Sequence, residues 1–128
     1  MRIDVLALDG VFDTGLTALL DVFGTANELS GSSKPPLRVR TVGVRRHVRT
    51  DLGLVVPVQA ADDRNPPDVM VAPALGTKTP QALEAALQRR DVRDAVDLLR
   101  ERSAHGIRMA AAARLQIPNC VVECPHNN

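Results

Sequence analysis

The stretch Arg2-Ile-Asp-Val-Leu-Ala-Leu-Asp-Gly10 decides the fold class of this chain. Its apolar run is nearly continuous up to Leu8, which is typical of a strand that is covered on both faces of a sheet. Asp9-Gly10 marks a turn, and Asp13 or Thr14 can cap a helix whose apolar residues recur at helical spacing as far as Ala26. A buried strand followed by an amphipathic helix predicts a parallel α/β unit.

The alternation of strands and helices continues along the chain. Strands are predicted at 37–44, 69–72 and 107–112, helices from Thr79-Pro80 and from a capping Asp91, and a small hairpin between 45 and 56. We expect the inner helix faces to be Leu83, Ala86, Leu87, Val92, Ala95, Val96 and Leu99. The pattern predicts an α/β fold, a doubly wound and mainly parallel sheet with helices on both faces and a functional crevice at the carboxyl ends of the strands.

Composition excludes several classes of function. The 128 residues fit one domain, and a net charge of +1 provides no global field toward nucleic acid or an anionic membrane. Only 2% of the residues are aromatic, which argues against base-stacking platforms. The chain starts without a signal-peptide layout and has no apolar segment of membrane-spanning length, so we expect a cytoplasmic protein without a membrane partner.

Three further motifs are better explained by structure than by ligand binding. Gly76-Thr-Lys-Thr79 lacks the spacing of a phosphate loop. The basic residues Arg38, Arg40, Arg45, Arg46 and Arg49 indicate a solvated strand edge. Cys120, Cys124 and His126 offer three crowded ligands where zinc needs four. We therefore expect no metal and no cofactor.

The stretch Gly106-Ile-Arg-Met-Ala-Ala-Ala-Ala-Arg-Leu-Gln116 is typical of a buried strand that runs into a sharp turn, where many α/β hydrolases present a nucleophile. Here the turn receives Ala113 and Arg114. The backbone N–H groups of Ala74 and Leu75 could serve as oxyanion donors and Asp13 as an acid, but the turn offers no nucleophile. His47 and His105 are expected in solvent, so no catalytic residue is predicted.

In their order and spacing, four segments resemble the ThiJ/PfpI domain, which has the class I glutamine-amidotransferase-like α/β fold. More closely, they resemble the amidase-like N-terminal domain of AraC-family transcriptional regulators. The segments are Val5-Leu-Ala-Leu-Asp-Gly10, Leu20-Asp-Val-Phe23 with Ala26-Asn-Glu-Leu29, Pro67-Asp-Val-Met-Val-Ala-Pro-Ala-Leu-Gly76, and Gly106-Ile-Arg-Met-Ala-Ala-Ala112.

Departures from the family pattern concern both catalytic groups. Gly15 stands where the family places an acid on the first helix, and Ala113-Arg-Leu stands where the cysteine elbow should begin. The resemblance covers residues 1–112. The atypical tail 113–128 suggests a truncated or frame-shifted end, and we expect that a helix-turn-helix DNA-binding domain is missing from this chain.

The resemblance implies a non-catalytic effector-binding or dimerisation domain of an AraC-type regulator, which would reach DNA only through the missing domain. We expect an unidentified small-molecule effector and, because a sheet edge should be left uncovered, self-association into a homo-oligomer. The ligand-binding candidates are Asp9, Asp13, Asn27, Ala74, Leu75 and Ala113, although Asn27 can instead hydrogen-bond the end of its own helix. The alternatives are a hydrolase or glyoxalase-like enzyme with Cys120 as a displaced nucleophile, and a plain dimerisation module.

Overall fold

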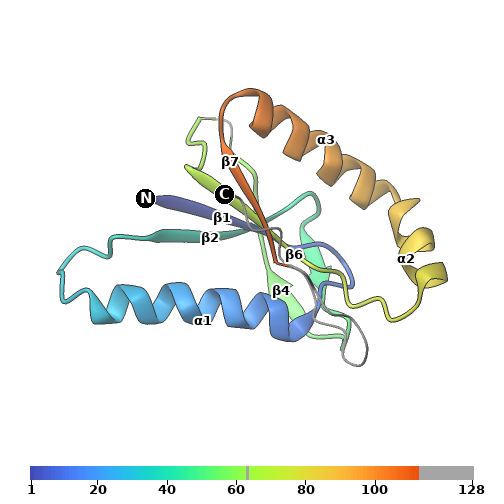
Figure 1. Cartoon of the computed structure of the whole chain (residues 1–128), viewed down its shortest axis with the longest axis horizontal. Helices are drawn as coiled ribbons and strands as arrows, with labels where there is room; N and C mark the ends of the chain where they lie inside the picture. The colour runs from blue at the N-terminus through green and yellow to red at the C-terminus, as the bar shows by residue number, and fades with distance from the viewer. Residues whose placement is uncertain (63, 113–128) are drawn as a thin grey trace, which may run out of the picture.

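The computed structural model describes residues 1–62 and 64–112, in which a central parallel sheet lies between two helical layers (Figure 1). The sheet has the strand order β5-β2-β1-β6-β7. Helix α1 covers one face and α3 the other. The elements are β1 (Arg2–Leu6), α1 (Asp13–Leu29), β2 (Arg38–Gly43), β3 (His47–Arg49), β4 (Val55–Pro57), β5 (Gln59–Ala60), β6 (Val69–Pro73), α2 (Pro80–Leu87), α3 (Arg90–Ala104) and β7 (Arg108–Ala112).

The pairing of the strands confirms the predicted fold class. Strand β1 lies at the centre and pairs in parallel with both β2 and β6, and β7 pairs in parallel with β6 along its whole length. Strands β3 and β4 form the predicted hairpin as a separate antiparallel pair. The short β5, which the sequence did not predict, pairs with β2 only at Val42 and Gly43.

Two hydrophobic clusters hold the layers together. On one face Ile3 and Val5 of β1 pack with Leu16 of α1, and on the other Leu6 and Met70 pack with Ala95 of α3. Val5 and Met70 have no exposed surface. Complete burial of such side chains contributes about 1.5–3 kcal/mol each, so these two clusters are the main source of stability.

The predicted N-cap residue is confirmed in one of the three helices. Thr79 caps α2, because its hydroxyl accepts a hydrogen bond from Ala82 N–H (3.1 Å). The predicted caps of the other two helices are wrong. Phe12 is the N-cap of α1 and Arg89 that of α3, and neither makes a side-chain capping bond. Asp13 and Asp91 lie within the first turns, where their carboxylates bind other partners.

Several predicted inner-face residues are exposed. Leu83 and Leu87 are 43% and 52% exposed, whereas Ala86 between them is buried. In α3 Val92 and Ala95 are buried as predicted, but Val96 is 38% exposed. Strand β7 is also exposed, contrary to prediction, because it is an edge strand within the described part of the chain. Across residues 1–62 and 64–112, no helix has both the length and the apolarity to cross a bilayer.

Candidate functional site

The turn between β1 and α1 lies between two other chain segments at the carboxyl end of the sheet. Val11 forms a parallel bridge to Thr50, which follows β3, and an antiparallel bridge to Leu75, which follows β6. Four backbone hydrogen bonds join the three segments: Gly10 N–H to Arg49 O (2.8 Å), Asp51 N–H to Val11 O (3.0 Å), Phe12 N–H to Ala74 O (2.8 Å) and Gly76 N–H to Gly10 O (2.7 Å). The turn at the predicted crevice is therefore cross-linked to both neighbouring segments.

Gly76 allows the two outer segments to approach each other. A Cβ atom at this position would lie closer than 3.0 Å to the side chain of Asp51, a distance that Cβ atoms in proteins essentially never show. Only glycine fits here without a shift of the neighbouring backbone. The glycine of the Gly76-Thr-Lys-Thr79 segment therefore serves the close packing of this segment against Asp51.

Asp9 joins two other segments of the chain through its side chain and its carbonyl group. Its Oδ1 accepts a hydrogen bond from Arg49 N–H (3.0 Å), and its carbonyl accepts one from Arg89 Nη2 (2.7 Å). The small space behind it, toward Arg45 and Asp91, has no room for a water molecule. Asp9 therefore forms part of the wall on the α3 side.

Asp13 presents a different environment. It is the first residue of α1, and its Oδ1 accepts a hydrogen bond from Leu52 N–H (3.1 Å). Its Oδ2 is buried and has no hydrogen-bond partner among the described residues. A buried carboxylate oxygen is expensive to leave unpaired, so Oδ2 is an unused hydrogen-bond acceptor at this turn among the described residues.

An ion pair that the sequence analysis missed stands beside Asp9. Arg89 Nε lies 2.9 Å from Asp91 Oδ1, and its Nη2 lies 2.9 Å from Asp91 Oδ2. Burial opposes ionisation of Asp91, but the hydrogen bonds and charge of Arg89 outweigh it, so the pKa of Asp91 is lowered below its usual value of 3.8. An arginine two residues before an aspartate gave no recognisable motif, and Asp91 was predicted as a cap instead.

The segment after β6 contributes its backbone. Ala74 N–H donates to Ala112 O (3.0 Å), so this group is not available as the oxyanion donor that we expected. Leu75 lies at the crevice through its bridge to Val11. His105 ends α3 with Nδ1 placed 2.7 Å from Glu101 O, and both predicted solvent histidines are exposed.

Ala113 lies outside the described residues, as do Cys120, Cys124 and His126. Within residues 1–62 and 64–112, no group of histidine, cysteine, aspartate and glutamate side chains is arranged to hold a metal ion.

Asn27 does not share a site with Asp9 and Asp13. Its Nδ2 donates to Leu37 O (2.8 Å), and its Oδ1 accepts from Leu37 N–H (2.9 Å). Leu37 directly precedes β2, so Asn27 lies near the amino ends of the strands, away from the crevice. The alternative, a hydrogen bond to the end of its own helix, is not what the side chain makes, since both of its bonds go to Leu37 ahead of β2.

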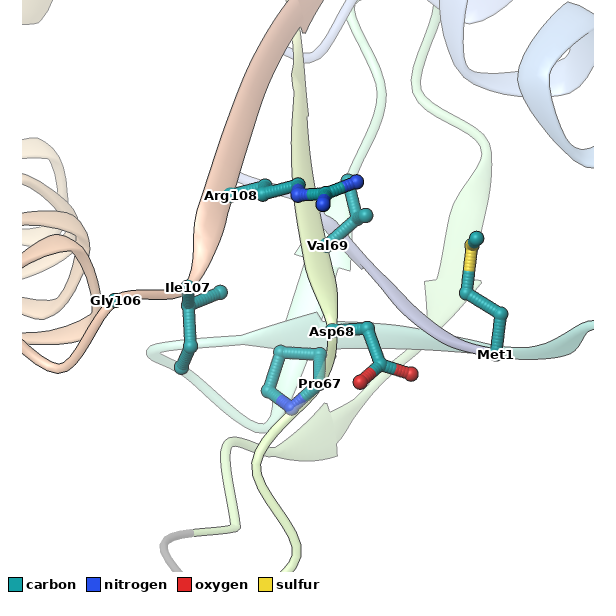
Figure 2. Close-up of a pocket in the computed structure, with 7 residues that line it drawn as sticks. All are labelled: Met1, Pro67, Asp68, Val69, Gly106, Ile107 and Arg108. Carbon is teal, nitrogen blue, oxygen red and sulfur yellow. The ribbon is translucent and has the colours of Figure 1, made fainter.

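A hollow of about 440 Å³ also lies at the amino ends of the strands (Figure 2). Figure 2 shows the Arg108 side chain of β7 beside Val69 of β6, and the carboxylate of Asp68 close to Pro67. The Asp68 Oδ2 atom accepts a hydrogen bond from Arg2 N–H (2.7 Å), which ties the start of β6 to β1. The hollow thus lies at the end of the sheet opposite to Asp13.

Comparison with solved structures identifies the class of fold. The chain resembles an AraC family transcriptional regulator from Pseudomonas putida (24% identity, TM-score 0.65, 86% of this chain and 62% of that chain). It also resembles a provisionally assigned transcriptional regulator from Vibrio parahaemolyticus (17%, 0.63, 87% and 55%) and oxidized DJ-1 from Toxoplasma gondii (16%, 0.58, 86% and 54%).

These likenesses show that the chain has the ThiJ/PfpI-like α/β fold, as its sequence predicted. The chain spans between 54% and 62% of the length of these structures. No family model matches the sequence, and a search of curated proteins also found no match.

Proposed function

We propose that this chain is a non-catalytic, effector-binding domain of an AraC-type transcriptional regulator, which acts on DNA through a domain that this chain does not contain. The ThiJ/PfpI-like fold and the two regulators among its structural neighbours support this class. Gly15 and Ala113, which stand where the family places its acid and its cysteine, support a role without catalysis.

The observation that carries the proposal is the buried Oδ2 atom of Asp13, which lacks a partner in the described part of the chain. An unsatisfied buried acceptor costs about 1–3 kcal/mol, which a bound donor would recover. The effector is therefore a small molecule with an N–H or O–H group, such as an amine, an amide or an alcohol. Since Leu52 N–H already holds Oδ1, the ligand's donor would meet a carboxylate of fixed orientation.

Regulation requires the effector to prefer one of two arrangements of the domain, because a ligand that binds both equally shifts nothing. Asp13 and Leu52 join helix α1 to the β3–β4 hairpin. A ligand at Oδ2 would favour the arrangement in which these two elements are joined. The position of the β3–β4 hairpin would therefore depend on whether the effector is bound.

The test is a thermal-unfolding screen of small amines, amides and alcohols, with matched ethers, which have no N–H or O–H donor, as a control set. A true effector raises the melting temperature of the wild type by mass action and loses this effect in Asp13→Ala. Asp9→Asn is the matched control, since Asp9 only builds the wall. Stabilisation by the amines, amides or alcohols that persists in Asp13→Ala, or that the ethers produce equally, would overturn the assignment of the site.

DNA binding provides a second test. The chain alone should not bind the sequence upstream of its own gene more tightly than an unrelated duplex of equal length, as measured by fluorescence anisotropy at 0.15 M salt. Sequence-specific binding by these 128 residues would contradict the proposal and assign the contact to a basic surface such as the hairpin.

The enzymatic alternative has a direct chemical test. A displaced nucleophile at Cys120 would need a thiol with depressed pKa and therefore faster alkylation than an ordinary cysteine. We expect iodoacetamide to modify Cys120 and Cys124 at equal rates, measured by peptide mass spectrometry. Selective modification of Cys120 would favour the hydrolase or glyoxalase-like alternative.

A further inference from the structure

A second groove lies between α1 and the first half of β2, two elements that run side by side in Figure 1. Its volume is about 510 Å³, within the range of small-molecule sites in proteins. It is lined by Leu20, Gly24, Asn27, Lys34, Pro35, Leu37, Arg38 and Val39. The groove therefore lies on the α1 face, away from the turn that holds Asp13.

Gly24 opens the groove. It lies inside the 17-residue helix α1, where glycine destabilises a helix by about 1 kcal/mol relative to alanine. A Cβ atom at this position would meet no other atom within 4 Å. Packing therefore does not require glycine here, and the missing side chain leaves open space where α1 lines the groove.

The floor of the groove is apolar. Leu20, Leu37 and Val39 pack against the core cluster beneath α1 and are only partly buried. A ligand that covered the remaining surface of these three side chains would gain hydrophobic free energy. The two hydrogen bonds between Asn27 and Leu37 hold this floor in place, so Asn27 is a positioning residue.

The charged residues of the lining are both basic. Lys34 and Arg38 are exposed, and neither forms an ion pair within the described ranges. The lining contains no acidic residue that could neutralise them. Arg38 lies between Leu37 and Val39, which pack on the α1 face, so its own side chain points to the opposite face of the sheet. Lys34 is therefore the unpaired cation at the rim of the apolar groove, and it complements a ligand with one anionic end and an apolar body.

From this geometry we propose that the groove binds a small carboxylic acid with an aliphatic body. The carboxylate accepts a hydrogen bond from Lys34, and the aliphatic body lies over Leu20, Leu37 and Val39 beside Gly24. This site is separate from the crevice of the proposed effector, and it selects the opposite charge at its polar end.

Octanoate is the probe, and isothermal titration calorimetry with the whole chain is the measurement. In Asp13→Ala, which lacks the proposed acceptor for alcohols, we expect saturable binding of octanoate and binding of 1-octanol that is at least tenfold weaker, since charge-assisted hydrogen bonds contribute about 1.5–3 kcal/mol. Lys34→Met should weaken octanoate binding by at least tenfold, whereas Arg38→Met should leave octanoate binding unchanged. Lys78→Met, at an exposed lysine outside the lining, should leave it unchanged.

Substitution of Gly24 separates binding from folding. Gly24→Leu should fill the groove and weaken octanoate binding at least tenfold, while the better helix propensity keeps the melting temperature at or above that of the wild type. Asp13→Ala should leave octanoate binding intact, so that failure of this site and failure of the effector site remain distinguishable.

Equal binding of octanoate and 1-octanol, or unchanged binding in Gly24→Leu, would overturn the proposal. A groove that instead serves as a contact between copies would show no octanoate binding, and Gly24→Leu would change the sedimentation coefficient; that result would also overturn it.

Discussion

Asp4 of β1 and Arg40 of β2 face each other across neighbouring parallel strands and form a two-pronged ion pair. Arg40 Nε lies 2.8 Å from Asp4 Oδ1, and Arg40 Nη2 lies 3.0 Å from Asp4 Oδ2. The side chain of Asp4 is only 2% exposed, and Arg40 Nη2 also donates to Asn65 O (3.0 Å). The pair thus satisfies a buried charge and anchors the loop that leads to β6.

Removal of one partner of this pair should be strongly destabilising. Arg40→Ala leaves the Asp4 carboxylate buried without its cation, so we expect a loss of about 3–5 kcal/mol in the free energy of unfolding by urea. The double variant Asp4→Leu, Arg40→Met should recover most of this loss, because no buried charge remains. Equal stability of Arg40→Ala and the wild type would contradict the burial of Asp4.

Gly76→Ala should destabilise the fold at the crevice. The new methyl group would collide with the side chain of Asp51, and forced overpacking of this kind costs about 1–3 kcal/mol. Asp51→Gly should suppress the effect in a double-mutant cycle. Gly24→Ala is the matched control and should stabilise, since no atom is in the way. If the free-energy changes of the two single variants simply add in the double variant, the two residues are not in contact.

Stability should depend on pH through Asp91. Burial raises the pKa of this carboxyl but the Arg89 guanidinium lowers it more, so that it falls below 3.8. The folded-state pKa of Asp91 lies below its pKa in the unfolded chain. The contribution of Asp91 to stability is therefore fully present above the unfolded-state pKa, and it is lost as the pH falls through the lowered folded-state pKa.

The free energy of unfolding, measured by urea titration from pH 6 to pH 2, should therefore fall more steeply in the wild type than in Asp91→Asn. The control is Asp94→Asn, at an exposed position on the same helix, which should follow the wild type. Parallel curves for Asp91→Asn and the wild type would exclude a role of the Arg89 pair.

Self-association should involve the β7 edge. Met109 is 38% exposed on this strand, and an apolar groove of about 420 Å³ lies between β7 and α3, with Val96 and Leu99 in its lining. An exposed apolar edge strand favours pairing with a second chain. We expect sedimentation equilibrium at about 50 μM to show a dimer or larger species, and Met109→Glu to shift it toward monomer.

The control for this experiment is Leu29→Glu, since Leu29 is 81% exposed at the end of α1. A wild-type chain that is monomeric at every concentration would contradict the prediction.

The fold was predictable because its evidence is local. The apolar run up to Leu8 and the Thr79-Pro80 helix start each follow from neighbouring residues, and both are confirmed. Strand β5 was missed because two residues are too short to show a period. The exposure of β7 depends on which strands lie beside it, and no local pattern contains that information.

The candidate site was predictable only in its position. Asp9 and Asp13 lie at the crevice because strand ends of a parallel sheet meet there. Their partners Arg49 and Leu52 are 40 and 39 residues away, so neither bond can be read from spacing. Asn27 was assigned to the same crevice because it lies on α1. However, the two ends of this 17-residue helix lie near opposite ends of the strands.

The two bridges of Val11 have a dynamic consequence. The amides of Gly10, Phe12, Asp51 and Gly76 belong to three separate segments, yet each bond involves the same short turn. Local opening should therefore expose all four amides in one cooperative step, with a shared hydrogen-exchange rate rather than four independent rates. The base of the crevice then opens as a single unit.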